Sequence, residues 1–225
     1  SRILAADSSS AATAFGGVAW AELVGDNSAA CVPTTLSQSY TRAAAYGSGN
    51  AVSATDGGRA IVLGNDNVGT AVAATESRAT VLVSGTGNHG TAESTDGGDA
   101  YARVIGSGNT ADADAAASGI SRALAVGTDS SAQASSVNGV AKATAGSGST
   151  GVADTDGGWA KAAAFDSSVA SADSTDGGLA NAFADDDSAA SASADGGLAS
   201  AVAINGSAAE ATSELGYASA SADNS

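Results

Sequence analysis

The stretch Thr175-Asp-Gly-Gly-Leu-Ala-Asn-Ala-Phe-Ala184 decides the fold, because it joins a tight-turn sequence to a run in which Ala alternates with other residues. The Asp-Gly-Gly triplet recurs along the chain at intervals of about 20 residues or a multiple of that spacing. Its copies begin at Asp56, Asp96, Asp156, Asp176 and Asp195. A fixed period of this length is typical of architectures in which similar units stack on one another.

Each unit contains two short alternating runs separated by turn sequences, such as Gly106–Asn109 between one unit and the next. Alternation with a period of two is the pattern of a β-strand with one buried face. We therefore expect an all-β protein, a two-sided β-solenoid of about 11 coils of about 20 residues each, over residues 11–225. Residues 1–10 precede these units as a cap or donor strand. A single antiparallel meander would use the same turns but would leave its Ala face uncovered.

The composition predicts a thin core, because the chain has no Met and only 9 aromatic residues (2 Trp, 4 Tyr and 3 Phe). Each buried methyl group contributes only about 0.8 kcal/mol, so stability must accumulate through repetition. The inward positions predicted in the second strand of each unit are Ala60, Val62, Ala79, Val81, Val83, Ala100, Ala102, Val104, Ala160, Ala162, Ala164, Ala180, Ala182, Ala184, Ala199, Ala201, Ala203, Ala218, Ala220 and Ala222. The facing wall is predicted from Ala71, Ala73, Ala111, Ala113, Ala170, Ala172, Ala190 and Ala192.

Residues 31–39 interrupt the pattern. Pro33 is the only Pro in the chain and has no N–H group to donate to a central ladder. We expect residues 31–39 to form an exposed loop inserted in the second coil. Cys31 is the only Cys, so it cannot form an internal disulfide, and we interpret it as a buried thiol, with a reactive thiol as the alternative.

The outward positions of the second strands hold seven of the eight basic residues and eight of the nine aromatic residues. Large side chains favour the β conformation, and cations discourage pairing at sheet edges. These effects explain why basic and aromatic residues occur on strands, but not why they gather on the second strand of each unit. The first strands instead carry acidic residues such as Glu93, Asp112, Asp114, Asp173 and Glu210. A contiguous patch favours an interface with another copy, a cell surface or a polysaccharide. The predicted outer interaction face comprises Trp20, Tyr40, Arg42, Arg59, Arg78, Tyr101, Arg103, Arg122, Lys142, Trp159, Lys161, Phe183 and Tyr217.

The net charge of −16 argues against a nucleic-acid partner, because phosphate binding needs clustered cations. No apolar run approaches the roughly 18 residues needed to cross a bilayer. His89 stands alone and Cys31 has no nearby His, so we expect no enzymatic activity. The chain begins at Ser1 without an apolar leader, which fits a mature exported protein.

Stacking in register would align the turn aspartates along one edge of the solenoid. The weak candidates for a metal site are Asp56, Asp96, Asp156, Asp176 and Asp195, with calcium as the matching ion. The alternative interpretation is that Asp is selected there for turn geometry and is solvated. We therefore expect no cofactor, with calcium as the one candidate.

The strand-turn-strand unit of about 20 residues resembles the curli-type subunits of bacterial functional amyloid and, more loosely, other bacterial surface β-solenoids. The resemblance extends over most of the chain at the level of the period, with Ala in place of the internal Gln and Asn ladders of curli repeats. It implies a secreted structural protein that polymerises into extracellular fibres, as in cell-surface filaments, adhesive fibres or a biofilm matrix.

The last unit, residues 208–225, repeats the pattern of its predecessors, and we expect its ladder to continue into the first coil of another copy. This predicts a head-to-tail homopolymer, with lateral bundling as a second self-contact. The residues predicted at the polymer ends are Ile3, Leu4, Tyr217, Ala218, Ala220 and Ala222. The alternative function is a binding module in which one flat face recognises a polysaccharide or ice.

Overall fold

The protein folds into two parallel β-sheets, of 12 and 11 strands, in a computed structural model that describes residues 2–6, 11–13, 18–24, 29–32, 40–47, 49, 51–54, 58–66, 68–73, 78–95 and 97–223. We call them the odd sheet and the even sheet after their strand numbers. The odd sheet contains β1 (Arg2–Ala6), β3 (Val18–Val24), β5 (Tyr40–Tyr46), β7 (Gly58–Leu63), β9 (Arg78–Thr86), β11 (Asp99–Ser107), β13 (Ile120–Val126), β15 (Val140–Gly146), β17 (Trp159–Phe165), β19 (Leu179–Asp185), β21 (Leu198–Ile204) and β23 (Tyr217–Asp223). The even sheet contains β2 (Ala11–Thr13), β4 (Ala29–Val32), β6 (Ala51–Ala54), β8 (Val68–Ala73), β10 (His89–Ser94), β12 (Thr110–Ala115), β14 (Ser131–Val137), β16 (Thr150–Asp156), β18 (Val169–Thr175), β20 (Ala189–Ala194) and β22 (Ala208–Ser213).

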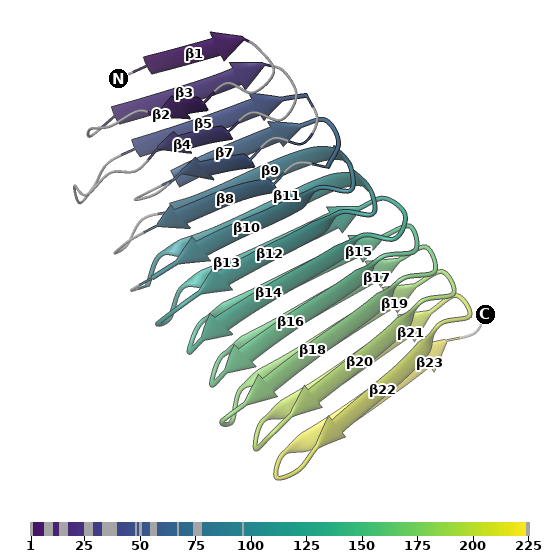
Figure 1. The fold of residues 1–225 in the computed structure, drawn as a ribbon. Coiled ribbons are helices and arrows are strands. Elements are labelled where there is room, and N and C mark those ends of the chain that lie inside the picture. Colours follow the sequence, from purple (N-terminus) through teal and green to yellow (C-terminus); the bar gives the residue numbers. More distant parts are fainter. Residues whose placement is uncertain are drawn as a thin grey trace.

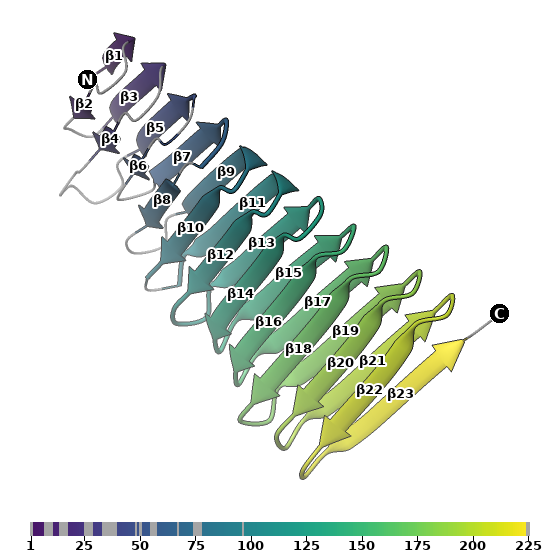
Figure 2. The ribbon, with the colours of Figure 1, turned by 45° about the vertical axis from the view of Figure 1, so that its right-hand side comes forward.

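The chain alternates between the two sheets, and each strand pairs in parallel with the strand one coil away. Figures 1 and 2 show the result as a flattened rod with the two termini at opposite ends. This confirms the predicted two-sided β-solenoid. The strand count of the odd sheet differs slightly from the expected 11 coils, because residues 2–6 form β1 and pair with β3.

Ala lines the space between the sheets, as the alternation predicts. Ala160, Ala162 and Ala164 of β17 are all 0% exposed, and the larger side chains of Val81, Val83 and Val104 are equally buried. The final coil departs from the predicted burial. Its inward positions Ala218, Ala220 and Ala222 are exposed, because among the described residues no coil lies beyond β23. The side chains of Val62 and Ala73 lie outside the described part of the structure.

The turns that lead from even strands to odd strands define one edge of the rod, which we call the Asp-Gly-Gly edge. Its two glycines have different roles. Gly157 and Gly177 adopt φ values of 73° and 82°, a left-handed conformation that favours Gly. Gly158 is required for space, because a Cβ atom there would collide with the carbonyl oxygen of Gly139 in the preceding coil. The repeated triplet therefore permits both the tight turn and the close stacking of coils.

A ladder of buried polar side chains, which the alternating pattern does not predict, runs along the opposite edge. The Asn88 N–H group donates to Asn109 Oδ1 at 2.8 Å, and Asn109 Nδ2 donates to the Gly85 carbonyl at 2.9 Å. In later coils a Ser hydroxyl replaces the Asn side chain as the acceptor. For example, the Ser168 N–H group donates to Ser188 Oγ at 3.0 Å. The predicted Ala-only interior is therefore incomplete. The ladder consists of Asn88, Asn109, Ser130, Ser149, Ser168, Ser188 and Ser207.

The first two residues of the predicted loop over residues 31–39 lie in a strand. Cys31 and Val32 belong to β4, and β4 pairs with β6 through Cys31 and Ser53. Residues 33–39, including Pro33, lie outside the described residues. The interruption therefore leaves the first strand of this coil in the even sheet.

Candidate interaction faces

The outward side of the odd sheet carries a line of cations, which we call the cationic column. Strand pairing places Arg122 beside Lys142, and Lys142 beside Lys161, in three successive coils. Adjacent strands lie about 4.8 Å apart, so the three charges repel one another. Among the described residues, no ion pair or side-chain hydrogen bond involves any of the three. Within the part of the chain that the structure describes, these three charges therefore have no counter-charge.

Apolar side chains flank the cationic column. The same register aligns Trp159, Leu179, Leu198 and Tyr217, which are 42%, 38%, 52% and 66% exposed. Ile120 and Val140 extend this apolar column toward the N-terminal end. On the other side of the cations, the Phe183 ring lies 5.8 Å from the Phe165 ring of the neighbouring coil, at 52°. An exposed apolar surface of this extent is typical of an interface.

The outward side of the even sheet is acidic. We call Glu93, Asp114, Asp154 and Asp173 the acidic column, because strand register aligns them, with Ser135 between Asp114 and Asp154. Burial raises the pKa of Asp154 above its usual 3.8, and the charge of Asp173 adds to the rise. Burial likewise raises the pKa of Asp114, followed by repulsion from Asp112 and Glu93. The fold thus holds like charges close together on this face.

Two ion pairs relieve part of the charge near the middle of the rod. His89 Nε2 lies 3.6 Å from Asp112 Oδ2, and protonated His89 attracts that carboxylate. Burial nevertheless outweighs the imidazole, so the pKa of Asp112 stays raised. On the odd sheet, Arg78 pairs with Asp99 of the next coil at 3.1 Å. Sequence reasoning missed this pair because the two residues are 21 positions apart, and only the coil register brings them together.

The outer interaction face predicted from the sequence falls on the odd sheet. Trp20 and Tyr40 belong to β3 and β5, although their side chains lie outside the described part of the structure. Arg78 pairs with Asp99, and Arg103 keeps a buried Nε without a hydrogen-bond partner. The remaining predicted residues all lie on odd-numbered strands, namely Arg42, Arg59, Tyr101, Arg122, Lys142, Trp159, Lys161, Phe183 and Tyr217.

Three of the predicted turn aspartates, Asp156, Asp176 and Asp195, lie in the described part of the structure. Asp156 ends β16, where it accepts a 3.2 Å hydrogen bond from Thr175 Oγ1, whereas Asp176 and Asp195 lie in later turns. Asp56 and Asp96 are outside the described residues. No group of three or more His, Cys, Asp or Glu side chains is placed to hold a metal ion in the part that the structure describes. Calcium binding stays a prediction from the sequence.

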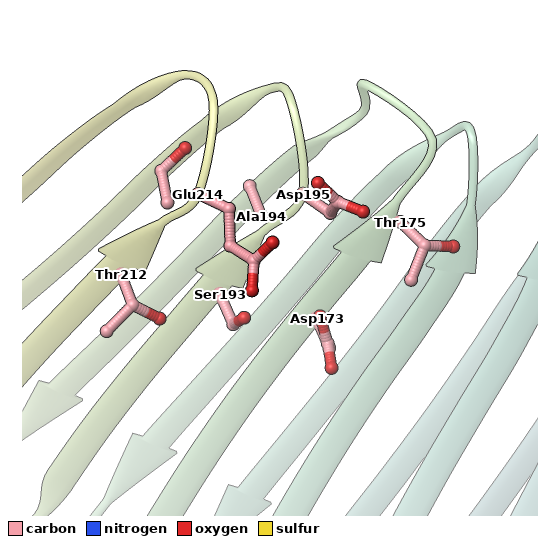
Figure 3. A pocket seen from close by; sticks show the side chains of 8 residues that line it. Asp173, Thr175, Ser193, Ala194, Asp195, Thr212 and Glu214 are labelled. Carbon is pink, nitrogen blue, oxygen red and sulfur yellow. The ribbon is translucent and has the colours of Figure 1, made fainter.

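A hollow of about 390 Å³ lies at the Asp-Gly-Gly edge, near the C-terminal end of the rod. Figure 3 shows side chains that line it. Asp173, Asp195 and Glu214 contribute carboxylates, and Thr175, Ser193 and Thr212 contribute hydroxyl groups. The lining contains no His, Lys or Arg that would activate a hydroxyl group as a nucleophile. The hollow is therefore an acidic feature of the surface.

The ends of the rod place the predicted polymer-end residues on edge strands. Ile3 and Leu4 lie in β1, which pairs with β3 through Ala21 and Glu22. Tyr217, Ala218, Ala220 and Ala222 lie in β23, which pairs with β21. Within the described residues, each of these two strands has a neighbour on one side only.

Within the described residues, no helix has the length and apolar character needed to cross a lipid bilayer. No protein-family model, curated protein or solved structure matches this chain. The class of protein rests on the fold alone, a β-solenoid of stacked coils of about 20 residues.

Proposed function

We propose that this chain is a structural subunit of an extracellular filament that grows head-to-tail by stacking of coils. The observation that supports this most is the uniform register. From β13 to β21 every odd strand pairs in parallel with the next, with Ala opposite Ala at nearly every inward position. A contact between two copies would repeat the contact that each coil already makes with its neighbour.

The edge of β23 has the chemistry to accept such a coil. The Tyr217 N–H group donates to the Gly197 carbonyl at 3.0 Å, so it points along the rod toward the preceding coil. Alternate residues of a strand direct their N–H groups to opposite neighbours, so Ala218, Ala220 and Ala222 direct theirs away from β21. These three residues are also exposed. A stacked coil would satisfy the N–H groups and bury the methyl groups together.

Because the two ends of a rod differ, stacking of this kind is heterologous and produces an open fibre. An odd sheet of 12 strands at about 4.8 Å corresponds to a rise of roughly 55 Å per subunit. The extracellular location is part of the proposal and is supported by the resemblance of the repeat to curli-type subunits.

Blocking the edge of β23 tests this proposal. Ala220→Pro removes an N–H group that points away from β21, so the ladder inside the rod keeps its bonds. Seeded growth of purified protein, followed by light scattering and electron microscopy, should fall sharply for Ala220→Pro and not for Ala220→Ser, which retains the N–H group. Equal growth of both variants, with unchanged circular dichroism, would show that this edge takes no part in assembly.

A glycan-binding face is the second candidate, favoured by the alignment of the exposed Trp159 and Tyr217 rings in the apolar column. Aromatic rings bind sugars by stacking on their apolar faces. Cosedimentation with insoluble polysaccharides should then be lost in Trp159→Ala and kept in Val169→Ala, a change on the opposite sheet. Trp fluorescence that stays constant during glycan titration would eliminate this candidate.

A further inference from the structure

The cationic and acidic columns occupy the same position across the width of the rod. Asp154 stands three residues before Gly157, and Lys161 stands three residues after Gly158. Since these two glycines form the turn that joins β16 to β17, the two side chains are equally far from the Asp-Gly-Gly edge. Both point outward, on opposite sides of the same coil.

Strand register repeats this matching position of cation and carboxylate in neighbouring coils along the rod. Lys161 aligns with Lys142 and Arg122 on one side. Asp154 aligns with Asp173 and, through Ser135, with Asp114 on the other side. A second copy shifted along the normal to the sheets, without rotation, would therefore place its acidic column against the cationic column of the first.

Within one copy, like charges lie close together in each column. The cationic column has no ion-pair partner among the described residues. On the acidic side, burial and neighbouring carboxylates raise the pKa of Asp114 and of Asp154. Contact between the columns would relieve repulsion on both surfaces at once.

The same translation matches a fourth cation, Arg103, with an acidic residue of the even sheet. Arg103 lies in β11, two positions along the strand from Tyr101, and so lies closer to the centre of the rod than the cationic column does. On the even sheet Asp112 of β12 is likewise two positions farther from the Asp-Gly-Gly edge than Asp114. Arg103 and Asp112 therefore fall opposite each other in the translated pair.

Each outward face of the rod is large enough to support such a contact. The even sheet of 11 strands at about 4.8 Å, with strands of about six residues at about 3.3 Å, gives roughly 1,000 Å² per face. A stable protein interface buries about 800 Å² on each partner. The apolar column and Phe183 would be covered by the even sheet, where Val137 and Val169 are 42% and 45% exposed.

We propose that the odd-sheet face of this protein docks on the even-sheet face of a second copy, related to the first by translation along the sheet normal. Pairing of two odd-sheet faces would instead place cations against cations. The contact is heterologous and does not close, so repeated docking forms a lateral stack of rods. This goes beyond the proposed function, because lateral stacking does not require growth at the ends.

Complementary charge reversals provide the test. Lys142→Glu with Lys161→Glu makes both faces acidic, and Asp154→Lys with Asp173→Lys makes both faces basic. All proteins also carry Ala220→Pro, so that lateral contact is measured apart from end growth. The parent should form lateral oligomers in sedimentation velocity at about 50 mM salt, and higher salt should weaken them because surface charges are screened. Each reversed variant alone should associate at least about tenfold more weakly, since like charges then face each other.

An equimolar mixture of the two reversed variants should restore association, because each acidic face then meets a basic face. Lys142→Arg with Lys161→Arg is the matched control and should associate like the parent. Failure of the mixture to recover, or reversed variants that associate as well as the parent, would overturn the proposal. A parent that stays monomeric at low salt while binding polygalacturonate would assign the cationic column to an anionic glycan. Filament length in proteins with an intact Ala220 reports on the proposed function separately from filament width.

Discussion

Gly158→Ala tests how closely the coils stack. The added Cβ would collide with the Gly139 carbonyl oxygen, which now accepts a 2.9 Å hydrogen bond from the Trp159 N–H group. Relief of the collision requires the two coils to separate, which breaks that bond. An unsatisfied backbone group costs about 1–3 kcal/mol and overpacking another 1–3 kcal/mol, against a gain of about 0.4–1 kcal/mol from a stiffer unfolded chain. The free energy of unfolding should therefore fall by about 3 kcal/mol.

Thermal unfolding followed by circular dichroism measures this effect. A loss of about 3 kcal/mol corresponds to a fall in Tm of roughly 6–12 °C for a chain of this length. Gly146→Ala is the matched control, since a Cβ there meets no atom within 4 Å and the backbone does not have a positive φ. Its Tm should stay within about 2 °C of the parent value or rise. Equal Tm values for the two variants would refute the close-stacking argument.

Three further predictions concern the core, the acidic column and the polar ladder. Ala182→Leu should lower the free energy of unfolding, measured by urea titration, by about 1–3 kcal/mol. The outward Ser200→Leu should change it by less than about 0.5 kcal/mol. Equal effects of the two substitutions would contradict the inward assignment of Ala182. Asp154→Asn should raise Tm at pH 7, because the raised pKa of Asp154 means that its ionised carboxylate destabilises the folded state. This destabilisation disappears as the pH falls through the raised pKa, so the Tm gain of Asp154→Asn should be lost near pH 3. An advantage that persists at about pH 3 would exclude charge as the cause. Ser188→Ala leaves the Ser168 N–H group without its acceptor and should cost about 1–3 kcal/mol, with Ser200→Ala as the control; equal stability of the two variants would mean that the ladder is dispensable.

Most of the fold could be predicted from the sequence, because period-two alternation with Ala indicates strands with one buried Ala face and the repeated turns indicate stacked units. The inward positions Ala180, Ala182 and Ala184 are at most 3% exposed, as predicted. Ala218, Ala220 and Ala222 share the pattern but are exposed, since burial in a solenoid depends on the neighbouring coil as well as on the strand itself.

The polar ladder was missed because its members precede the strands and resemble ordinary turn residues. Their signal is spacing: Asn88, Asn109 and Ser130 follow each other at intervals of 21 residues. The alignment of the two charged columns also required the structure. Lys161 and Asp154 are close in sequence, but only strand register shows that their neighbours form continuous columns at one distance from the turn.

Helical reconstruction of the purified protein by cryo-electron microscopy, at concentrations where it assembles, tests the central claim most directly. The account predicts filaments with continuous strand layers about 4.8 Å apart along the axis and a subunit rise of roughly 55 Å. A monodisperse monomer at high concentration, or filaments without an axial repeat near the strand spacing, would contradict growth by coil stacking.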